Sequence, residues 1–414
     1  MQAENFSLLD ASLVAVSVIV ALIMLRPAIR DAAFWRATVT PLASIIGSGF
    51  LIVAPLLANI AGVWSIVCIV AIVLLSFWVG SVIRFNILHH GHAGSVNGND
   101  IGNGTAAKLE RLSDIALAFA YVISVTFYVR LMSGFILTGV DAYTPFNANV
   151  LASIVLLFIG CYGWSRGLRG LERLEEYSVT IKLAVIVSLL LGLMHYDGRR
   201  GFDLTDFSPI HVGVWEGARM LAGMLLIVQG FETSKYLSAA YDAPLRARSM
   251  QLAQVLAGVI YIAFVALALP LMAPFTRQAA TETAIIGLSA NITLVLPIML
   301  IVAATMSQFS AAIADIIGAG GVVEDVGRNK IPARLSYPVL TMLAVALMWS
   351  SHIFEVVTFA SRAFAFYYLL QTLLATRLAY IMMVGRQRQW LVFAYGSLSV
   401  VLLWVVLFAI PVVA

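Results

Sequence analysis

Residues 40–62 read TPLASIIGSGFLIVAPLLANIAG, an apolar stretch interrupted in its middle by Gly47, Ser48 and Gly49. Each glycine destabilises a helix interior by about 0.5–1 kcal/mol relative to alanine, so a helix is most easily lost at this point. Lipid cannot bond freed N–H and C=O groups, and a break at membrane depth is tolerated only beside protein or a water-filled cavity. The stretch therefore indicates either a ligand site or a contact where helices pack closely through small residues.

The rest of the chain has the composition of a membrane protein. Its 414 residues are 61% hydrophobic and 11% charged, with a mean hydropathy of +0.97, whereas soluble domains average about 45–50% apolar and about 25% charged. Apolar runs of about 20 residues, enough to cross a bilayer as a helix, recur along almost the whole length. We expect an all-α, polytopic membrane protein of about 12 transmembrane helices. The expected spans are residues 8–27, 34–60, 62–88, 112–138, 147–165, 174–195, 213–238, 250–273, 289–323, 335–350, 353–383 and 389–412.

The basic residues indicate the orientation in the membrane. The first apolar run has Glu4 and Asp10 before it and Arg26 and Arg30 after it, and it lacks the basic start of a signal peptide. We therefore expect a retained first helix with its N-terminus outside. Most of the 25 lysines and arginines then fall in loops on the cytoplasmic side. The expectation is a multi-pass protein of the cell (inner or plasma) membrane, with both termini outside.

A second interruption lies in the seventh apolar run, residues 224–244, MLLIVQGFETSKYLSAAYDAP. It is five helices after the first interruption. Transporters built from two inverted five-helix repeats place a discontinuous helix first in each repeat. We therefore expect residues 1–32 to form an extra N-terminal transmembrane helix. Residues 33–385 would form a ten-helix inverted-repeat core with discontinuous first and sixth helices, and residues 386–414 an additional C-terminal helix.

Three motifs resemble the amino acid–polyamine–organocation (APC) superfamily of transporters. IIGSGF (45–50) is similar to the Gly-Ser-Gly motif of the first core helix, and GFETSKYLSAAYDAP (230–244) looks like the sixth core helix. GRNKIPARL (327–335) resembles the Arg-Asp-Gly-x-x-Pro end of the eighth core helix, with Asn329 and Lys330 in place of Asp and Gly. The resemblance begins at about residue 33 by helix count. It departs in the extra first helix and in the one helix that follows the core.

The resemblance implies the five-plus-five (LeuT-type) fold and a secondary active transporter of amino acids or related small organic ions, working by alternating access. Freed amides at a helix break can hold a carboxylate, and freed carbonyls a cation. The candidate substrate-binding residues are Ile46, Gly47, Ser48, Gly49, Gln229, Gly230, Phe231, Glu232 and Thr233. Of these, Phe231 resembles the aromatic gate of relatives, and Glu232 could instead pair with Lys235 one helical turn away.

Lys182, in YSVTIKLAVIVSLLLG (177–192), is the candidate coupling residue. An ionisable residue in a span costs about 2.5–3.5 kcal/mol on insertion scales, which makes it a functional candidate. The resemblance implies that its ammonium contacts the carbonyls of Ala43 and Ile46 and the hydroxyls of Ser307 and Ser310, where relatives bind sodium. Proton coupling or uncoupled exchange would follow. Alternatively, Lys182 snorkels to the interface, and the two serines could then ligate a sodium ion.

Arg130, Asp315 and Arg362 are possible gate residues, although the arginines could instead cap carbonyls or snorkel outward. The sequence contains no P-loop, nucleophile elbow or His/Cys ligand cluster, so we expect no enzymatic activity, no cofactor and no metal site. The net charge of +4 lies in short loops and does not indicate nucleic-acid binding. The expected partners are a small-molecule substrate, a proton or a sodium ion, and the bilayer. A same-fold transporter of a polyamine or an inorganic ion with sodium coupling, and a non-transporting membrane sensor, stay open.

Overall fold

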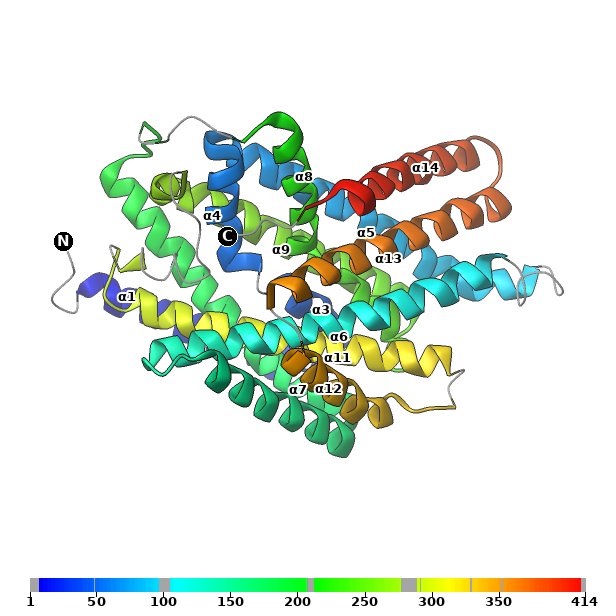
Figure 1. Ribbon diagram of the computed structural model, residues 1–414, viewed down its shortest axis with the longest axis horizontal. Coiled ribbons are helices and arrows are strands. Elements are labelled where there is room, and N and C mark those ends of the chain that lie inside the picture. The colour runs from blue at the N-terminus through cyan, green and yellow to red at the C-terminus, as the bar shows by residue number, and fades with distance from the viewer. Residues whose placement is uncertain are drawn as a thin grey trace.

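The computed structural model describes residues 7–47, 49–96, 105–205, 207, 212–276, 289–290, 292–327, 330–350 and 353–410. Within these ranges the regular elements are α-helices and short 3-10 helices, and none is a strand, which confirms the all-α prediction (Figure 1). In chain order they are α1 (Leu8–Met24), α2 (Pro27–Arg30), α3 (Ala33–Ile45), α4 (Gly49–Ala61), η1 (Gly62–Trp64), α5 (Ser65–Val96), α6 (Thr105–Gly139), α7 (Pro145–Arg200), α8 (Val214–Met224), η2 (Leu225–Val228), η3 (Phe231–Tyr236), α9 (Ala243–Ala268), η4 (Leu269–Thr276), α11 (Leu296–Val326), α12 (Ala333–Ser350), α13 (Ile353–Met382) and α14 (Gly385–Phe408).

Each apolar run that was expected to span the membrane contains a helix. Among the described residues, seven helices are long and apolar enough to cross a membrane, judged by length and composition. Two of them, Gly49–His89 and Pro145–Arg200, each join segments that the sequence assigned to two spans. The other expected spans correspond to α1, the interrupted segment from α8 to η3, and α13, and α3 is the first half of the expected span 34–60. A polytopic helical membrane protein is therefore confirmed.

Helix α7 changes direction at Gly167, which explains its length. Gly167 has φ 65° and ψ −163°, and the helices on either side of it are separate arms. A positive φ is accessible to glycine without the steric penalty that a Cβ brings. The two arms correspond to the expected spans 147–165 and 174–195. The second arm carries Lys182 into the centre of the molecule, where α7 packs against α3 and α11.

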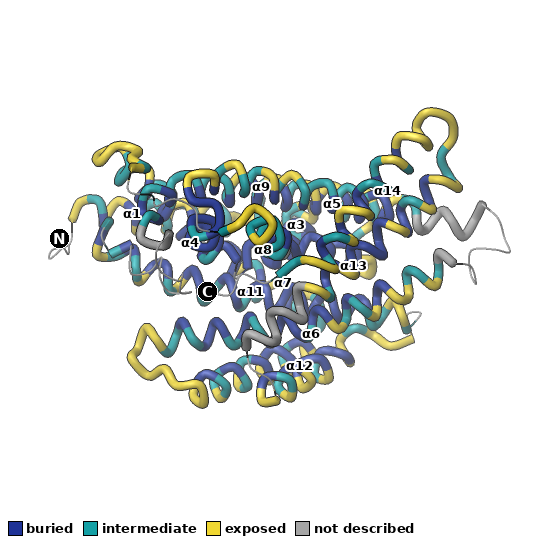
Figure 2. Tube along the Cα trace, turned by 45° about the horizontal axis from the view of Figure 1, so that its top comes forward, coloured by how far each residue is buried: buried dark blue, intermediate teal, exposed yellow. Residues whose placement is uncertain are grey.

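The broken helices lie in the interior of the molecule, surrounded by unbroken ones. Helix α3 packs against α7, α9 and α11, and α6 packs against α11 and α13. Buried residues are concentrated along these central helices, and the exposed residues lie on the outer faces and at the turns (Figure 2). Large apolar side chains such as Phe119, Leu343 and Phe393 are exposed there, as expected of a surface that faces lipid rather than water.

Candidate functional site

The first helix break has the location that the sequence predicts. Helix α3 ends at Ile45, Ile46 leaves the helical region with φ −84° and ψ 58°, and α4 begins at Gly49. Ser48, a candidate substrate-binding residue, lies outside the described residues. A Cβ on Gly49 would lie 2.4 Å from Cγ2 of Ile227 in the second broken helix, so glycine is required by this close approach.

The second break joins the first one directly. Gln229 and Gly230 separate η2 from η3, and Gly230 adopts the left-handed conformation with φ 111°. A Cβ on Gly230 would lie 2.3 Å from Oγ and 2.7 Å from the carbonyl carbon of Ser44 in α3. No side chain fits between the two segments. The structure therefore brings the breaks at Gly47 and Gly230 together at one place in the interior.

A buried tyrosine bridges the two breaks, and the sequence reasoning missed it. The hydroxyl of Tyr261, on α9, donates to the carbonyl oxygens of Ile45 and Ile227, each at 2.9 Å. Tyr261 is fully buried. A tyrosine in the apolar second half of α9 was the available signal, because a buried tyrosine hydroxyl usually has a hydrogen-bond partner. The sequence could not say which partner.

The structure brings Lys182 together with the residues named beside it. Its Nζ donates to the carbonyl oxygens of Ala43 at 2.9 Å and Ile46 at 2.8 Å, and to Oγ of Ser310 at 2.9 Å. These three acceptors match the three donors of an ammonium group. Oγ of Ser307 donates to the Ile46 carbonyl at 2.5 Å. Lys182 is fully buried, so its ammonium does not snorkel to an interface.

Glu232 lies directly beside the second break. Its Oε2 accepts from the backbone N–H of Gly230 at 3.0 Å and from the hydroxyl of Tyr368 at 2.6 Å. The ring of Tyr368 stacks on Phe231 with 5.3 Å between centroids. Oγ1 of Thr233 donates to the carbonyl oxygen of Gly230, three residues earlier in the chain, at 2.7 Å. The candidate residues of this segment therefore form one buried cluster around the left-handed glycine.

Lys235 does not pair with Glu232, which was the alternative interpretation of the sequence. Its Nζ instead lies 3.1 Å from Oε1 of Glu110 and 3.8 Å from Oδ1 of Asp114, both on α6. Glu232 Oε1 and Gln229 Oε1 are buried and make no hydrogen bond of regular geometry among the described residues, although the Glu232 carboxylate interacts with the Tyr121 hydroxyl and the Gln229 side chain with that of Tyr128. Buried acceptors without a donor are rare in native proteins and call for an explanation. These two atoms can accept hydrogen bonds from a polar ligand.

The three possible gate residues are not brought together. Asp315, on α11, is buried and accepts from Oγ of Ser44 at 2.7 Å and from Oγ of Ser124. Arg130 is half-buried on α6, six residues after Ser124, which is about 9 Å further along the helix axis. Arg362 is exposed on α13. Asp315 therefore joins α3, α6 and α11 through hydroxyl groups, and among the described residues no ion pair links it to Arg130 or Arg362. A gate role for these three residues stays a prediction.

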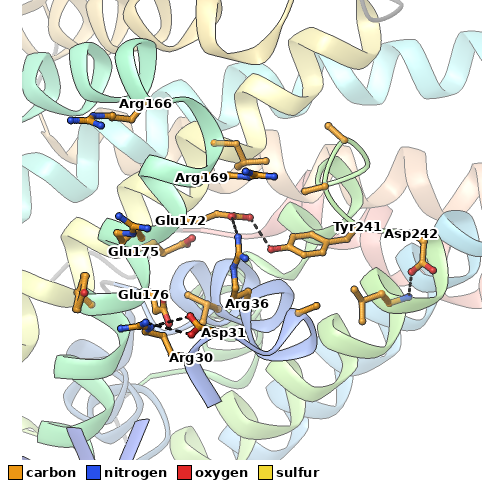
Figure 3. A pocket seen from close by; sticks show the side chains of 18 residues that line it. Arg30, Asp31, Arg36, Arg166, Arg169, Glu172, Glu175, Glu176, Tyr241 and Asp242 are labelled. Atoms are coloured by element: carbon orange, nitrogen blue, oxygen red, sulfur yellow. Dashed lines mark hydrogen bonds and ion pairs between the residues drawn. The ribbon is translucent and has the colours of Figure 1, made fainter. Parts of the chain in front are cut away.

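A cavity opens where α3 begins and where the second arm of α7 starts. This arginine-rich cavity has a volume of about 1170 Å³, and Arg30, Arg36, Arg166, Arg169 and Arg173 line it together with acidic side chains (Figure 3). Glu172 accepts from Arg36 Nη2 at 2.9 Å and from the Tyr241 hydroxyl at 3.0 Å. Burial and the nearby Glu172 carboxylate hold the pKa of Tyr241 above its ordinary value. Tyr241 is therefore a hydrogen-bond donor throughout the physiological pH range.

The comparisons with known proteins agree with the fold. A family model described as "APC superfamily transporter" matches residues 27–409. An uncharacterized protein of Aquifex aeolicus (strain VF5) is 41% identical over 356 residues, which is 86% of each chain. Crystal structures of a manganese transporter of Eremococcus coleocola, in two mutant forms, have 12% sequence identity. One, with a histidine replaced, has a TM-score of 0.55 and covers 91% of this chain and 87% of its own. The other, with a glutamate replaced by glutamine, has a TM-score of 0.56 and covers 98% of this chain and 88% of its own. At this identity they show the fold alone.

Proposed function

Because this chain belongs to the APC superfamily of transporters, we propose that it is a secondary active transporter of an amino acid or a related small organic ion. It works by alternating access around the two helix breaks, with a core of residues 33–385 between the extra helix α1 and the additional helix α14. The observation that supports this most directly is the contact between the breaks at Gly230 and Ser44. Two segments with freed backbone groups meet there in the interior.

A zwitterionic substrate suits the groups around the breaks. Helix α4 begins at Gly49, and its first N–H groups have no partner within the helix, which favours a carboxylate there. Gln229 Oε1 and Glu232 Oε1 are buried acceptors that make no hydrogen bond of regular geometry among the described residues, which suits an ammonium group. Phe231 and Tyr368 present their stacked rings beside them. The carboxylate and the amine of an amino acid would thus be bound by different breaks.

Lys182 supplies the coupling step. Its charged form holds the end of α3 to α7 and α11 through the three hydrogen bonds described above. Loss of the proton leaves one donor fewer on Nζ and no charge to stabilise the carbonyl contacts, so α3 is released. The equilibrium between inward-open and outward-open states then follows the protonation of one residue. Under the expected orientation, with both termini outside, the arginine-rich cavity faces the cytoplasm.

A divalent cation is the competing substrate, because the solved structures of similar fold belong to a manganese transporter. Divalent cations require several oxygen, nitrogen or sulfur ligands. Among the described residues no group of three or more His, Cys, Asp and Glu side chains could hold a metal ion. The described residues of the first break, Ile46 and Gly47, offer backbone groups only. We therefore favour the amino acid.

Uptake into proteoliposomes tests the proposal. Radiolabelled amino acids are supplied under an imposed pH or sodium gradient to wild type, to Lys182→Ala and to the loop control Lys330→Ala, which is exposed. We expect proton-driven uptake of at least one amino acid, with the pH response lost only in Lys182→Ala. Sodium-driven uptake that Lys182→Ala leaves unchanged would refute the lysine mechanism and assign the ion to Ser307 and Ser310. Uptake of manganese(II) without uptake of any amino acid would refute the substrate assignment.

A further inference from the structure

We propose that Glu175 is the group through which Lys182 exchanges its proton with the arginine-rich cavity. The proposal rests on the proposed function, because only a transporter that uses Lys182 as its proton carrier needs such a route. Lys182 is fully buried. A proton that leaves its ammonium must therefore cross several ångströms of protein before it reaches water. Glu175 lies between Lys182 and the arginine-rich cavity.

The route follows a row of polar contacts along the seam between α3 and α7. Nearest the cavity, Arg36 pairs with Glu172 at 2.9 Å. One turn further in, Oγ1 of Thr40 donates to Oε2 of Glu175 at 2.8 Å. Deepest, Lys182 donates to the carbonyls at the end of α3. The exposed fraction of the side chains falls from 39% for Arg36 and 7% for Glu172 to 0% for Glu175.

Glu175 connects the cavity with the interior. It is fully buried and yet belongs to the lining of the cavity, together with the buried Val39. Figure 3 places its side chain beside those of Glu172 and Glu176 on α7. Its second oxygen, Oε1, has no hydrogen-bond partner in the part of the chain that the structure describes. A proton or a water molecule at Oε1 would satisfy that oxygen, so Glu175 is suited to receive a proton and to release it.

Ser178 lies between Glu175 and Lys182 along the same helix. The two ionisable residues are seven positions apart on α7, about 10.5 Å along the helix axis and on the same face. Ser178 is three positions after Glu175 and four before Lys182, and it is buried. Its hydroxyl donates to the Leu174 carbonyl at 2.9 Å, which leaves its oxygen free to accept. A hydroxyl at this spacing, with a bridging water, can pass a proton in either direction.

The proton balance of the route is simple. The Lys182 ammonium gives up one proton and becomes a neutral amine, and the Glu175 carboxylate takes it up and becomes a neutral acid. The acid then releases the proton to water in the cavity, and the reverse sequence recharges the lysine. Besides Lys182, the ionisable groups around Glu175 include Glu172 on the same helix, Asp315 on α11 and Tyr241 before α9. Arg36, Arg173 and Glu176 line the same cavity. Glu172 is already paired with Arg36.

Three variants test this role in proteoliposomes. Glu175→Gln keeps the shape and an oxygen for Thr40 but cannot carry a proton, and Glu175→Asp keeps a carboxylate. Glu176→Gln is the matched control, one position along the same helix and in the same cavity lining. Each is assayed with a radiolabelled mixture of amino acids in two ways: net uptake driven by a pH gradient, and exchange at equal pH against the same unlabelled mixture inside the vesicles. Exchange needs no net proton movement.

We expect Glu175→Gln to lose tenfold or more of the gradient-driven uptake and to retain exchange within about twofold of wild type. Glu175→Asp should recover most of the uptake, and Glu176→Gln should match wild type in both assays. Equal losses of uptake and exchange in Glu175→Gln would assign Glu175 a structural role and overturn the proposal. Wild-type behaviour of Glu175→Gln in both assays would also overturn it, while leaving Lys182 as the carrier. Absence of gradient-driven uptake in wild type would overturn the proposed function as well.

Discussion

Removal of one hydroxyl group tests whether the two helix breaks act as a unit. In Tyr261→Phe the carbonyls of Ile45 and Ile227 lose their shared donor. The ring stays, with its edge-to-face contact to Phe50 at 5.8 Å between centroids, so the change leaves no cavity. A hydroxyl has one proton to share between two acceptors. Leaving buried acceptors unpaired costs about 1–3 kcal/mol, and we expect the free energy of unfolding to fall by that amount.

The measurement is an unfolding titration with SDS in mixed micelles, followed by circular dichroism. Tyr380→Phe is the control, since it removes the same atom from a side chain that is 64% exposed on α13. We also expect amino-acid uptake by Tyr261→Phe to fall about tenfold, because about 1.4 kcal/mol of lost positioning energy corresponds to that factor. A net hydrogen bond contributes about 0.5–1.5 kcal/mol to stability. If the free energies of unfolding of Tyr261→Phe and Tyr380→Phe differ by less than the lower limit, about 0.5 kcal/mol, the bridge does not stabilise the site.

Three further changes have defined outcomes. Gly230→Ala places a Cβ against α3 at a φ of 111°, and strain with overpacking should cost about 2–6 kcal/mol in unfolding free energy. Gly396→Ala, in open space on α14, should stabilise by up to about 1 kcal/mol; equal effects of the two would contradict the close approach. Ser310→Ala removes a 2.9 Å bond to a charged group, so gradient-driven uptake should fall about tenfold, whereas Ser165→Ala, at an exposed hydroxyl, should leave it unchanged. Arg36→Gln breaks a half-exposed ion pair, and the same SDS titration should show a change below about 1 kcal/mol; a loss above about 3 kcal/mol would mean that the pair is effectively buried.

The sequence predicts where along a helix a break or a functional residue lies better than it predicts which helix faces pack against each other. The breaks at Gly47 and Gly230 are visible in the sequence because glycine and polar residues interrupt apolar runs, and such interruptions depend only on local composition. The resemblance also named Ala43, Ile46 and Ser310 as neighbours of Lys182, and the structure brings all of them together. Their role in coupling stays a prediction.

Contacts that depend on the rotation of one helix against another could not be predicted. Asp315 looked like a partner for an arginine, but its carboxylate faces hydroxyls of α3 and α6. Glu175 was not among the candidate residues, because nothing in the sequence says that it faces Thr40. Tyr261 was one aromatic residue among many. In each case the position along the helix is clear from the sequence, and the neighbouring helix is known only from the packing.

Helix α1 is hydrogen-bonded to both α7 and the residue that precedes α11. Oγ of Ser17 lies 2.7 Å from Oγ of Ser188 on α7, and Oδ1 of Asp10 accepts from the N–H of Val295, immediately before α11, at 3.1 Å. The two helices that hold Lys182 and Ser310 are thus both tied to α1. A spectroscopic label on α1 and a second on α7 should therefore keep a constant separation through the transport cycle. A label on α3 should change its distance to both, which makes α1 the natural origin for recording the cycle.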